Sequence, residues 1–302
     1  MAFEIATSPG QLSPVASPPY QVTKPPPWHG LIVMDLFCAE LAAGLFIVAA
    51  LGDLVAHGAY GAASRIGYIA AFPIAFIDVL CLVFDLGDPL RFHHMLRVFK
   101  LRSPMSIGTW AVSGFSILSF VCFVLAILNL PGLAQTRAII GGIGIPIALF
   151  VGGYKGVMLS CTAQPVWKSA RWLGAELVTS AALLGTAALL LVAVLLPAAS
   201  AEPGLRLAEL IMLCINFIFT LAFTLEAYPQ LVTAHSRQLL NLGGLLLVGW
   251  IVPIVLLLLG AAPGIIASAC LILAAGIAYR FELVMYPHRL SKLNQQYTEP
   301  VT

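Results

Sequence analysis

The sequence has little charge for its length. Of its 302 residues only 9% are Asp, Glu, Lys or Arg, whereas 60% are hydrophobic and the mean hydropathy is +0.98. A typical soluble domain has about 25% charged residues, so this chain cannot cover its surface with polar groups. The net charge of +2 is too small to indicate binding to nucleic acid. The composition therefore indicates an integral membrane protein in contact with lipid.

Other absences restrict the chemistry. The six cysteines fall one by one on or beside different apolar stretches, without the close spacing of a zinc or iron–sulfur site. The six histidines lie in connectors or at the ends of apolar stretches, whereas a transmembrane haem needs axial ligands within the spans. Nucleotide-binding loops and nucleophile–base spacings are also missing. We therefore expect no haem or metal on this chain, and no catalysis by the chain alone.

Long apolar stretches occupy most of the sequence. A helix needs about 20 apolar residues to cross a bilayer, because its backbone polar groups must be satisfied within the segment. The stretches that qualify are Leu31–Ala56, Ile66–Leu86, Ile107–Leu130, Ala138–Ser160, Leu173–Pro197, Leu205–Tyr228, Leu239–Gly260 and Gly264–Tyr286. We predict an all-α integral membrane protein with eight transmembrane helices, arranged as two four-helix bundles over residues 28–290.

The two ends of the chain differ from this core. Residues 1–27 contain seven prolines and are predicted to form an extended tail, because such a tract can neither propagate a helix nor bury a core. Residues 291–302 are predicted to be a short polar tail. An even number of spans places both ends on one membrane face, which then holds 12 of the 15 Lys and Arg residues. By the positive-inside rule that face is cytoplasmic.

Ionisable residues inside apolar stretches are costly and are candidates for function. Most of them here are acids: Asp35, Glu40, Asp78, Asp85, Glu176, Glu226 and Glu282. Asp78 and Asp85 are seven residues apart and share a helix face, so they could be two steps of a proton relay. The alternative is that these acids are structural, either neutral or paired, as Glu282 could be with Arg280 or Arg289.

The most polar connector, residues 85–110, holds four of the fifteen Lys and Arg residues and two of the six histidines. His93 and His94, next to Arg91, could bind the head group of an anionic or carbonyl-bearing ligand. They could equally be interfacial residues that meet lipid phosphates.

The fourth apolar stretch ends with Tyr154 and Lys155 among glycines. Small residues permit close helix approach and leave space around a phenol and an ammonium group. A phenol can donate a hydrogen bond to a carbonyl oxygen within an apolar slot. Taken alone, this pattern is a weak indication of a ligand site.

These segments together resemble the NrfD/polysulfide reductase membrane-subunit family. The resemblance rests on Asp85-Leu-Gly-Asp-Pro-Leu-Arg-Phe-His-His-Met-Leu96, on Arg102-Ser-Pro-Met-Ser-Ile-Gly-Thr-Trp110, and on Tyr154-Lys-Gly-Val-Met-Leu-Ser160 ahead of Pro165-Val-Trp167. Trp28 and the run from Leu36 to Gly44 are similar to the family's first span. The similarity covers nearly the whole chain from about residue 28.

The resemblance implies a haem-free, quinone-binding anchor of a respiratory oxidoreductase in the bacterial cytoplasmic (inner) membrane. Its partners would be an iron–sulfur subunit and a molybdopterin catalytic subunit, and its carrier menaquinone or ubiquinone. The first-span residue that hydrogen-bonds the quinone falls on Asp35, where the polysulfide reductase type has a histidine, and the fourth-span tyrosine falls on Tyr154. Polysulfide reductase types place this face outside the cytoplasm, whereas the charge count places it inside.

The predicted site has three parts. The quinone-binding residues, of which Asp35 and Tyr154 are the reacting pair, are Asp35, Glu40, Asp88, Arg91, His93, Tyr154 and Lys155. The proton path is Glu40, Asp78, Asp85 and Glu226. The partner interface is Arg91, His94, Arg97, Lys100 and Arg102. An alternative function is a proton or ion transporter that uses the intramembrane carboxylates.

Overall fold

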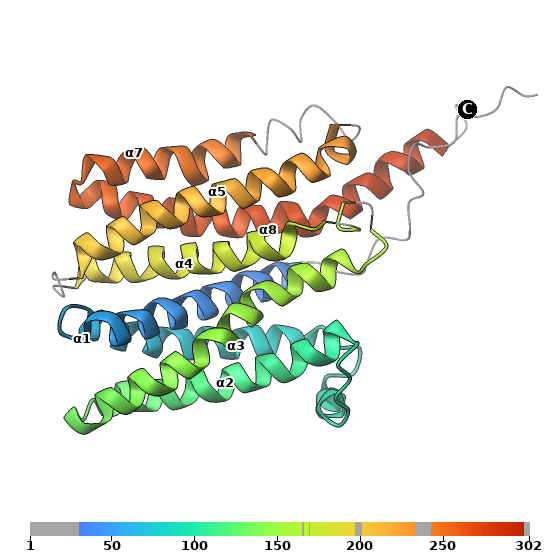
Figure 1. Ribbon diagram of the computed structural model, residues 1–302. Helices are drawn as coiled ribbons and strands as arrows, with labels where there is room; N and C mark the ends of the chain where they lie inside the picture. Colours follow the sequence, from blue (N-terminus) through green and yellow to red (C-terminus); the bar gives the residue numbers. More distant parts are fainter. Residues whose placement is uncertain (1–29, 165, 169, 197–200, 233–242, 299–302) are drawn as a thin grey trace, which may run out of the picture.

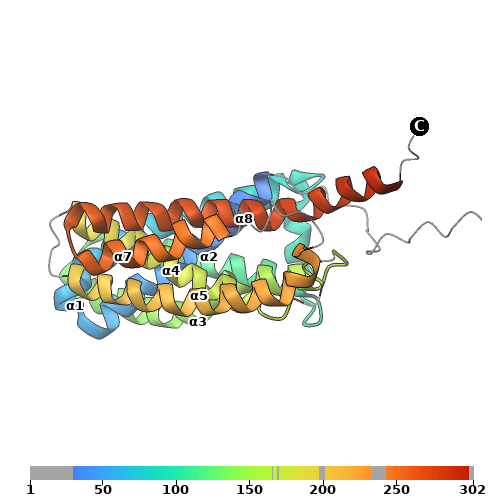
Figure 2. The same ribbon diagram turned by 90° about the horizontal axis from the view of Figure 1, so that it is seen from above.

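A computed structural model describes residues 30–298, except 165, 169, 197–200 and 233–242; the predicted tail 1–27 lies outside the described residues. The described residues form helices and no strand. In order these are α1 (Gly30–Phe84), η1 (Pro89–Leu96), α2 (Pro104–Leu128), η2 (Pro131–Leu133), α3 (Ala134–Ser160), α4 (Leu173–Leu195), α5 (Glu202–Val232), η3 (Leu247–Ile251), α7 (Val252–Leu259) and α8 (Ala262–Thr298). Figure 1 shows them side by side along one axis, and in Figure 2 the C-terminal part of α8 continues past the others, into the predicted polar tail.

Helix α1 is 55 residues long and contains the first two predicted spans. Only Ala56 leaves the helical region, with φ −153° and ψ 65°. In one straight helix Asp35 and Asp78 would be roughly 65 Å apart, yet the Lys155 ammonium contacts both. The chain therefore reverses at Ala56, and residues 57–65, predicted as a connector, are helical.

Local sequence explains where α2 begins and ends. The Ser103 side chain accepts a hydrogen bond from the amide of Ser106, and Pro104 occupies the first turn, where a missing amide hydrogen has no consequence. Asn129 ends the helix in the left-handed conformation, with φ 47°. The polar connector 85–103 therefore ends at Ser103, where α2 begins.

The helices form two groups that meet along α1 and α4. α1, α2 and α3 pack together, and α4, α5, α7 and α8 form the second group (Figure 1). The two groups meet closely where Gly44 of α1 faces Gly185 of α4. A Cβ at Gly44 would lie 1.8 Å from the carbonyl oxygen of Ala181, and one at Gly185 would lie 2.0 Å from the carbonyl carbon of Gly44. Only glycine permits this backbone contact.

Six of the described helices, α1 to α5 and α8, are long and apolar enough to cross a membrane. The seventh predicted span falls on a shorter apolar helix, Gly243–Leu259. Large apolar side chains such as Phe76, Ile117, Ile143 and Leu225 are exposed on the outside of the bundle. Such a surface suits a hydrocarbon environment rather than water.

We expect Gly44→Ala to destabilise the protein by about 1–3 kcal/mol, because the added methyl group forces α1 and α4 apart. Gly114→Ala on α2 is the matched control, since a Cβ there would meet nothing within 4 Å. The measurement is thermal unfolding in detergent, followed by the helical circular dichroism signal. Equal midpoints for the two variants would contradict the assigned contact.

Candidate functional site

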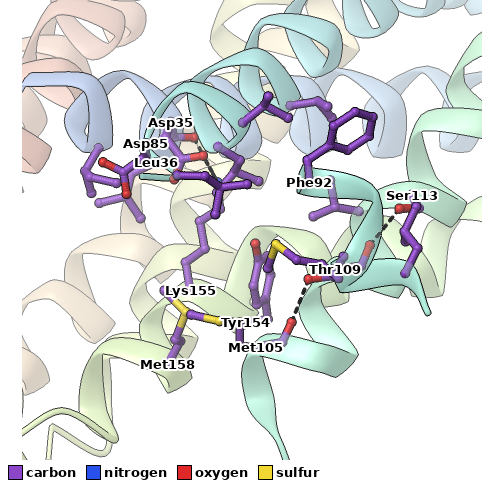
Figure 3. Close-up of a pocket in the computed structure, with 18 of the residues that line it drawn as sticks. Asp35, Leu36, Asp85, Phe92, Met105, Thr109, Ser113, Tyr154, Lys155 and Met158 are labelled. Carbon is purple, nitrogen blue, oxygen red and sulfur yellow. Dashed lines mark hydrogen bonds and ion pairs between the residues drawn. The ribbon is translucent and has the colours of Figure 1, made fainter. Parts of the chain in front are cut away.

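A cavity of about 240 Å³ lies between α1, α2, α3 and the connector that contains η1. Figure 3 shows Asp35 of α1, Asp85 just after the end of α1, Thr109 and Ser113 of α2, and Tyr154 and Lys155 of α3 around it. The rest of the lining is apolar and includes Phe92, Met95 and Leu96 of η1. An apolar cavity with a few converging polar groups is typical of a small-molecule site.

Lys155 holds the innermost polar cluster of the cavity together. Its Nζ lies 2.9 Å from Oδ1 of Asp35 and 2.7 Å from Oδ1 of Asp78, and it donates a further hydrogen bond of 3.1 Å to the backbone carbonyl of Asp35. Asp35 is 3% exposed, and Asp78 and Lys155 are each 2% exposed. Two carboxyl groups and one ammonium therefore share one buried site, joining both halves of α1 to α3.

The Tyr154 ring is fixed in position by its neighbours. It stacks on Phe150, with ring centroids 5.9 Å apart and an angle of 8° between the planes. On its other side α2 comes so close that a Cβ at Gly108 would lie 2.3 Å from Cε2 of the ring. The glycines around the Tyr154–Lys155 pair allow α3 to pack closely against α4. At Gly156, for example, a Cβ would lie only 2.8 Å from Cα of Gly174.

The connector covers the cavity with its apolar side chains. Phe92, Met95 and Leu96 line the cavity, whereas the basic side chains of the connector are exposed. The connector is held to α2 by Ser106, whose hydroxyl donates to the carbonyl of Val98 at 3.1 Å and accepts from the amide of Lys100 at 3.0 Å. The result is an apolar cover with a cationic outer face.

Asp85 is the polar group of the cavity nearest the connector. It follows directly after the end of α1 and lines the cavity. Partial burial raises its pKa above the usual value for an aspartate. Asp85 is thus more readily protonated than a fully solvated carboxyl group.

The predicted site residues separate into groups in the structure. Four line the cavity: Asp35, Asp85, Tyr154 and Lys155. Asp78 joins them through Lys155. Two others have partners outside the cavity: Glu40 binds Arg280, and Glu226 accepts a hydrogen bond from the amide of Trp172 at 3.3 Å. Asp88, Arg91 and His93 do not line the cavity either and are exposed, as are the other basic residues of the predicted partner interface on the connector.

Glu282 pairs with Arg289 at 2.6 Å, which is one of the two partners that the sequence suggested for it. Two buried pairs are missing from the sequence interpretation, and the first joins Arg280 to Glu40. A further buried pair joins Arg137 to Asp53, with Nε to Oδ2 at 2.7 Å and Nη2 to Oδ1 at 3.0 Å. The available signal was that Arg137 and Arg280 lie within or beside apolar stretches, where a cation needs a carboxylate partner.

The comparisons with known proteins agree with the family resemblance seen in the sequence. A scan against protein families matches residues 20–288 to "Polysulphide reductase, NrfD". The chain belongs to this family. NrfD proteins are multi-pass membrane anchor subunits of respiratory oxidoreductases, generally interact with quinone, and associate with iron–sulfur subunits. A search of curated proteins finds no match.

The described residues contain no group of three or more His, Cys, Asp or Glu side chains that could hold a metal ion. The residues of the cavity instead suit a quinone. Tyr154 can donate a hydrogen bond to a carbonyl oxygen, the Asp35 carboxyl group held by Lys155 also lines the cavity, and the surrounding walls are apolar. The lining of the cavity in this NrfD protein is thus chemically compatible with the carrier with which its family generally interacts.

Lys155→Met should destabilise the protein by about 3–5 kcal/mol, because it leaves two buried carboxyl groups without their cation. Lys168→Met, which changes an exposed lysine, is the control and should unfold like the wild type. Adding Asp78→Asn to Lys155→Met should restore part of the loss. Thermal unfolding in detergent measures all three, and a double variant no more stable than Lys155→Met would show that the two groups do not act together.

Proposed function

We propose that this chain is the quinone-reacting subunit of a membrane-bound oxidoreductase, and that the quinone head group binds between Asp35 and Tyr154. The cavity carries this proposal, because it combines apolar walls with a phenol, an ammonium and a carboxyl group at its inner end. The isoprenoid tail would extend into the hydrocarbon. Electrons would pass to or from an iron–sulfur subunit, beyond which we infer a molybdopterin catalytic subunit.

The bound quinone supplies the two-electron, two-proton chemistry, and the residues of this chain position it and move protons. Tyr154 is placed to donate a hydrogen bond to one carbonyl oxygen, because Phe150 and α2 leave its ring little freedom. Asp35 is placed to exchange a proton at the other. Two carboxyl groups around one ammonium are electrically neutral only when one carboxyl group holds a proton. Asp78 and Lys155 therefore allow Asp35 to gain or lose one.

The exposed connector is the proposed docking face for the iron–sulfur subunit. It carries the exposed residues Arg91, His94, Arg97, Lys100 and Arg102, while Phe92, Met95 and Leu96 of the same connector line the cavity. This arrangement shortens the distance from a cluster in the partner to the quinone.

The excess of Lys and Arg on this side supports a cytoplasmic location for this face and for both termini. We propose that the chain crosses the bacterial cytoplasmic membrane eight times. In this topology α1 crosses twice, on either side of Ala56.

Transport of protons or ions without redox chemistry is the other candidate function. The buried carboxyl groups favour it, since such groups are typical of proton relays. The two functions are distinguished by purification from membranes. An iron–sulfur subunit together with extractable quinone supports the redox function, whereas a chain that purifies alone and conducts ions supports transport.

We expect Asp35→Asn to lower quinone turnover by about 10²-fold or more, because a positioned proton-exchanging group typically contributes that much. Assembly should remain intact, since Lys155 keeps its contact with Asp78. Glu202→Gln, which alters a partly exposed pair with Arg206 on α5, should leave turnover unchanged. Quinol–acceptor activity of the purified complex is the measurement, and normal turnover in Asp35→Asn would reject the role of Asp35.

Gly108→Ala should raise the KM for quinone, because the added methyl group displaces the Tyr154 ring. We expect a loss of kcat/KM of roughly tenfold, the equivalent of one misplaced hydrogen bond. Gly114→Ala on the same helix has open space around its Cβ and is the matched control. Unchanged kinetics in Gly108→Ala would place the quinone elsewhere.

A further inference from the structure

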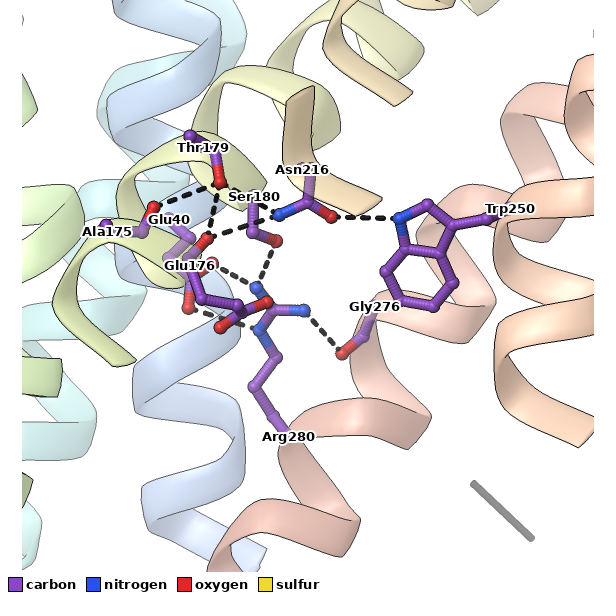
Figure 4. A network of polar contacts seen from close by, with 9 residues as sticks. All are labelled: Glu40, Ala175, Glu176, Thr179, Ser180, Asn216, Trp250, Gly276 and Arg280. Carbon is purple, nitrogen blue, oxygen red and sulfur yellow. Dashed lines mark hydrogen bonds and ion pairs between the residues drawn. The ribbon is translucent and has the colours of Figure 1, made fainter. Parts of the chain in front are cut away.

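A second buried polar cluster lies where α1, α4 and α8 meet. The Arg280 guanidinium makes a two-pronged contact with Glu40, through Nε to Oε1 at 3.1 Å and through Nη2 to Oε2. It also donates from Nη2 to the hydroxyl of Ser180 and from Nη1 to the carbonyl of Gly276 at 3.0 Å. Figure 4 shows these contacts converging on the guanidinium. Arg280, 2% exposed, has thus committed Nε and both terminal nitrogens.

Glu176 of α4 lies beside this pair and is not part of its hydrogen bonding. Its side chain is 1% exposed, and neither carboxyl oxygen has a hydrogen-bond partner among the described residues. Arg280 and Glu40 are nonetheless within electrostatic range of it. An ionised carboxylate without any donor would be very unfavourable at such a buried position.

The backbone around Glu176 is held in place by a separate set of hydrogen bonds. Asn216 of α5 donates to the carbonyl of Glu176 at 3.2 Å and to the hydroxyl of Thr179 at 3.0 Å. The oxygen of its amide accepts from the indole of Trp250 at 3.1 Å. Trp250 lies in the π-helical turn η3, a form that is frequent at functional sites. These hydrogen bonds therefore fix the backbone position from which the Glu176 side chain extends.

The charges of this cluster are unbalanced unless it contains a proton. Two carboxyl groups and one guanidinium carry a net negative charge when all are ionised, and burial makes a net charge costly. We propose that Glu40, Glu176 and Arg280 form a proton-binding site, in which Glu176 is the neutral acid and the Glu40–Arg280 pair is ionised. One proton then makes the cluster neutral.

The groups that face this site come from four helices. They are Glu40 of α1, Ser180 of α4, Asn216 of α5, and Tyr279 and Arg280 of α8. The Tyr279 hydroxyl is buried and has no hydrogen-bond partner among the described residues. Arg280 is the cation of this set, so the protonation of Glu176 depends on whether Arg280 is paired with Glu40.

Glu40 connects this site with the cavity. It follows Asp35 by five residues on α1, and Lys155 acts on it electrostatically. We infer that the proton on Glu176 is bound or released when the charge of the Asp35–Asp78–Lys155 cluster changes. This linkage rests on the proposed quinone reaction, whereas the proton-binding site itself does not.

Infrared spectroscopy of the purified complex tests the site directly, because a protonated carboxyl group has its own carbonyl stretching band. The wild type should show such a band that shifts in heavy water and on labelling the side-chain carboxyl of glutamate with a heavier carbon isotope. The label needs no substitution and separates glutamate from the aspartates of the cavity. A wild-type spectrum without a glutamate band would overturn the proposal.

Two substitutions identify the group and the mechanism. The substitutions are compared in a Glu209→Gln background, because Glu209 of α5 is also fully buried without a hydrogen-bond partner among the described residues and would give a band of its own. In this background Glu176→Gln should remove the remaining band. Glu40→Gln should remove it as well, although Glu176 is still present, because Arg280 loses its partner and Glu176 ionises to replace it. Glu282→Gln is the control, since Glu282 binds Arg289, and should retain the band. Persistence of the band in either of the first two variants would overturn the site.

The linkage has a separate readout. Reduction of the quinone should shift the glutamate band in the wild type, and the shift should vanish in Glu176→Gln. A glutamate band that is present but does not respond to the quinone would overturn the linkage and leave the site in place. If the complex does not turn over quinone at all, the proposed function fails, while the static spectrum still decides the proton-binding site.

Discussion

The structure depends on the pairing of buried charges in surroundings that cannot solvate them. Among the described residues, each buried cation lies against at least one carboxylate: Lys155 between Asp35 and Asp78, Arg280 against Glu40, and Arg137 against Asp53. Within a low dielectric an unpaired charge is far more unfavourable than in water. These contacts therefore define which helices lie next to one another, and they place the titratable groups where chemistry can use them.

Helix α1 carries a carboxyl group of every one of these pairs. Its reversal at Ala56 brings Asp35 and Asp78 to the same lysine, and its close approach to α4 at Gly44 and Gly185 puts Glu40 within reach of the second helix group. Glycine is needed at that approach because any side chain would separate the backbones. The position of one helix thus sets the geometry of both the cavity and the buried cluster at Arg280.

Two clusters with the same composition follow from this arrangement. Each contains two carboxyl groups and one cation, so each is neutral with one proton bound. One lines the apolar cavity beside Tyr154, and the other lies between α1, α4 and α8 beneath Asn216 and Trp250. In a membrane anchor that generally interacts with quinone, a pair of such clusters joined by five residues of α1 provides a physical basis for coupling electron transfer to proton movement.

The sequence by itself determined the helical membrane class and the family, because apolar length and local motifs are properties of neighbouring residues. It also singled out Asp35, Tyr154 and the polar connector, which the structure brings to one cavity. Its prediction of eight separate helices differs from the six long helices described for two reasons: α1 contains two predicted spans interrupted only at Ala56, and the seventh span falls on the shorter helix Gly243–Leu259. Only the tertiary structure decided that Lys155 joins Asp35 to Asp78, and that Arg280 binds Glu40 rather than nearby Glu282. Those pairings join residues up to 240 positions apart, and they depend on which helix faces meet in three dimensions.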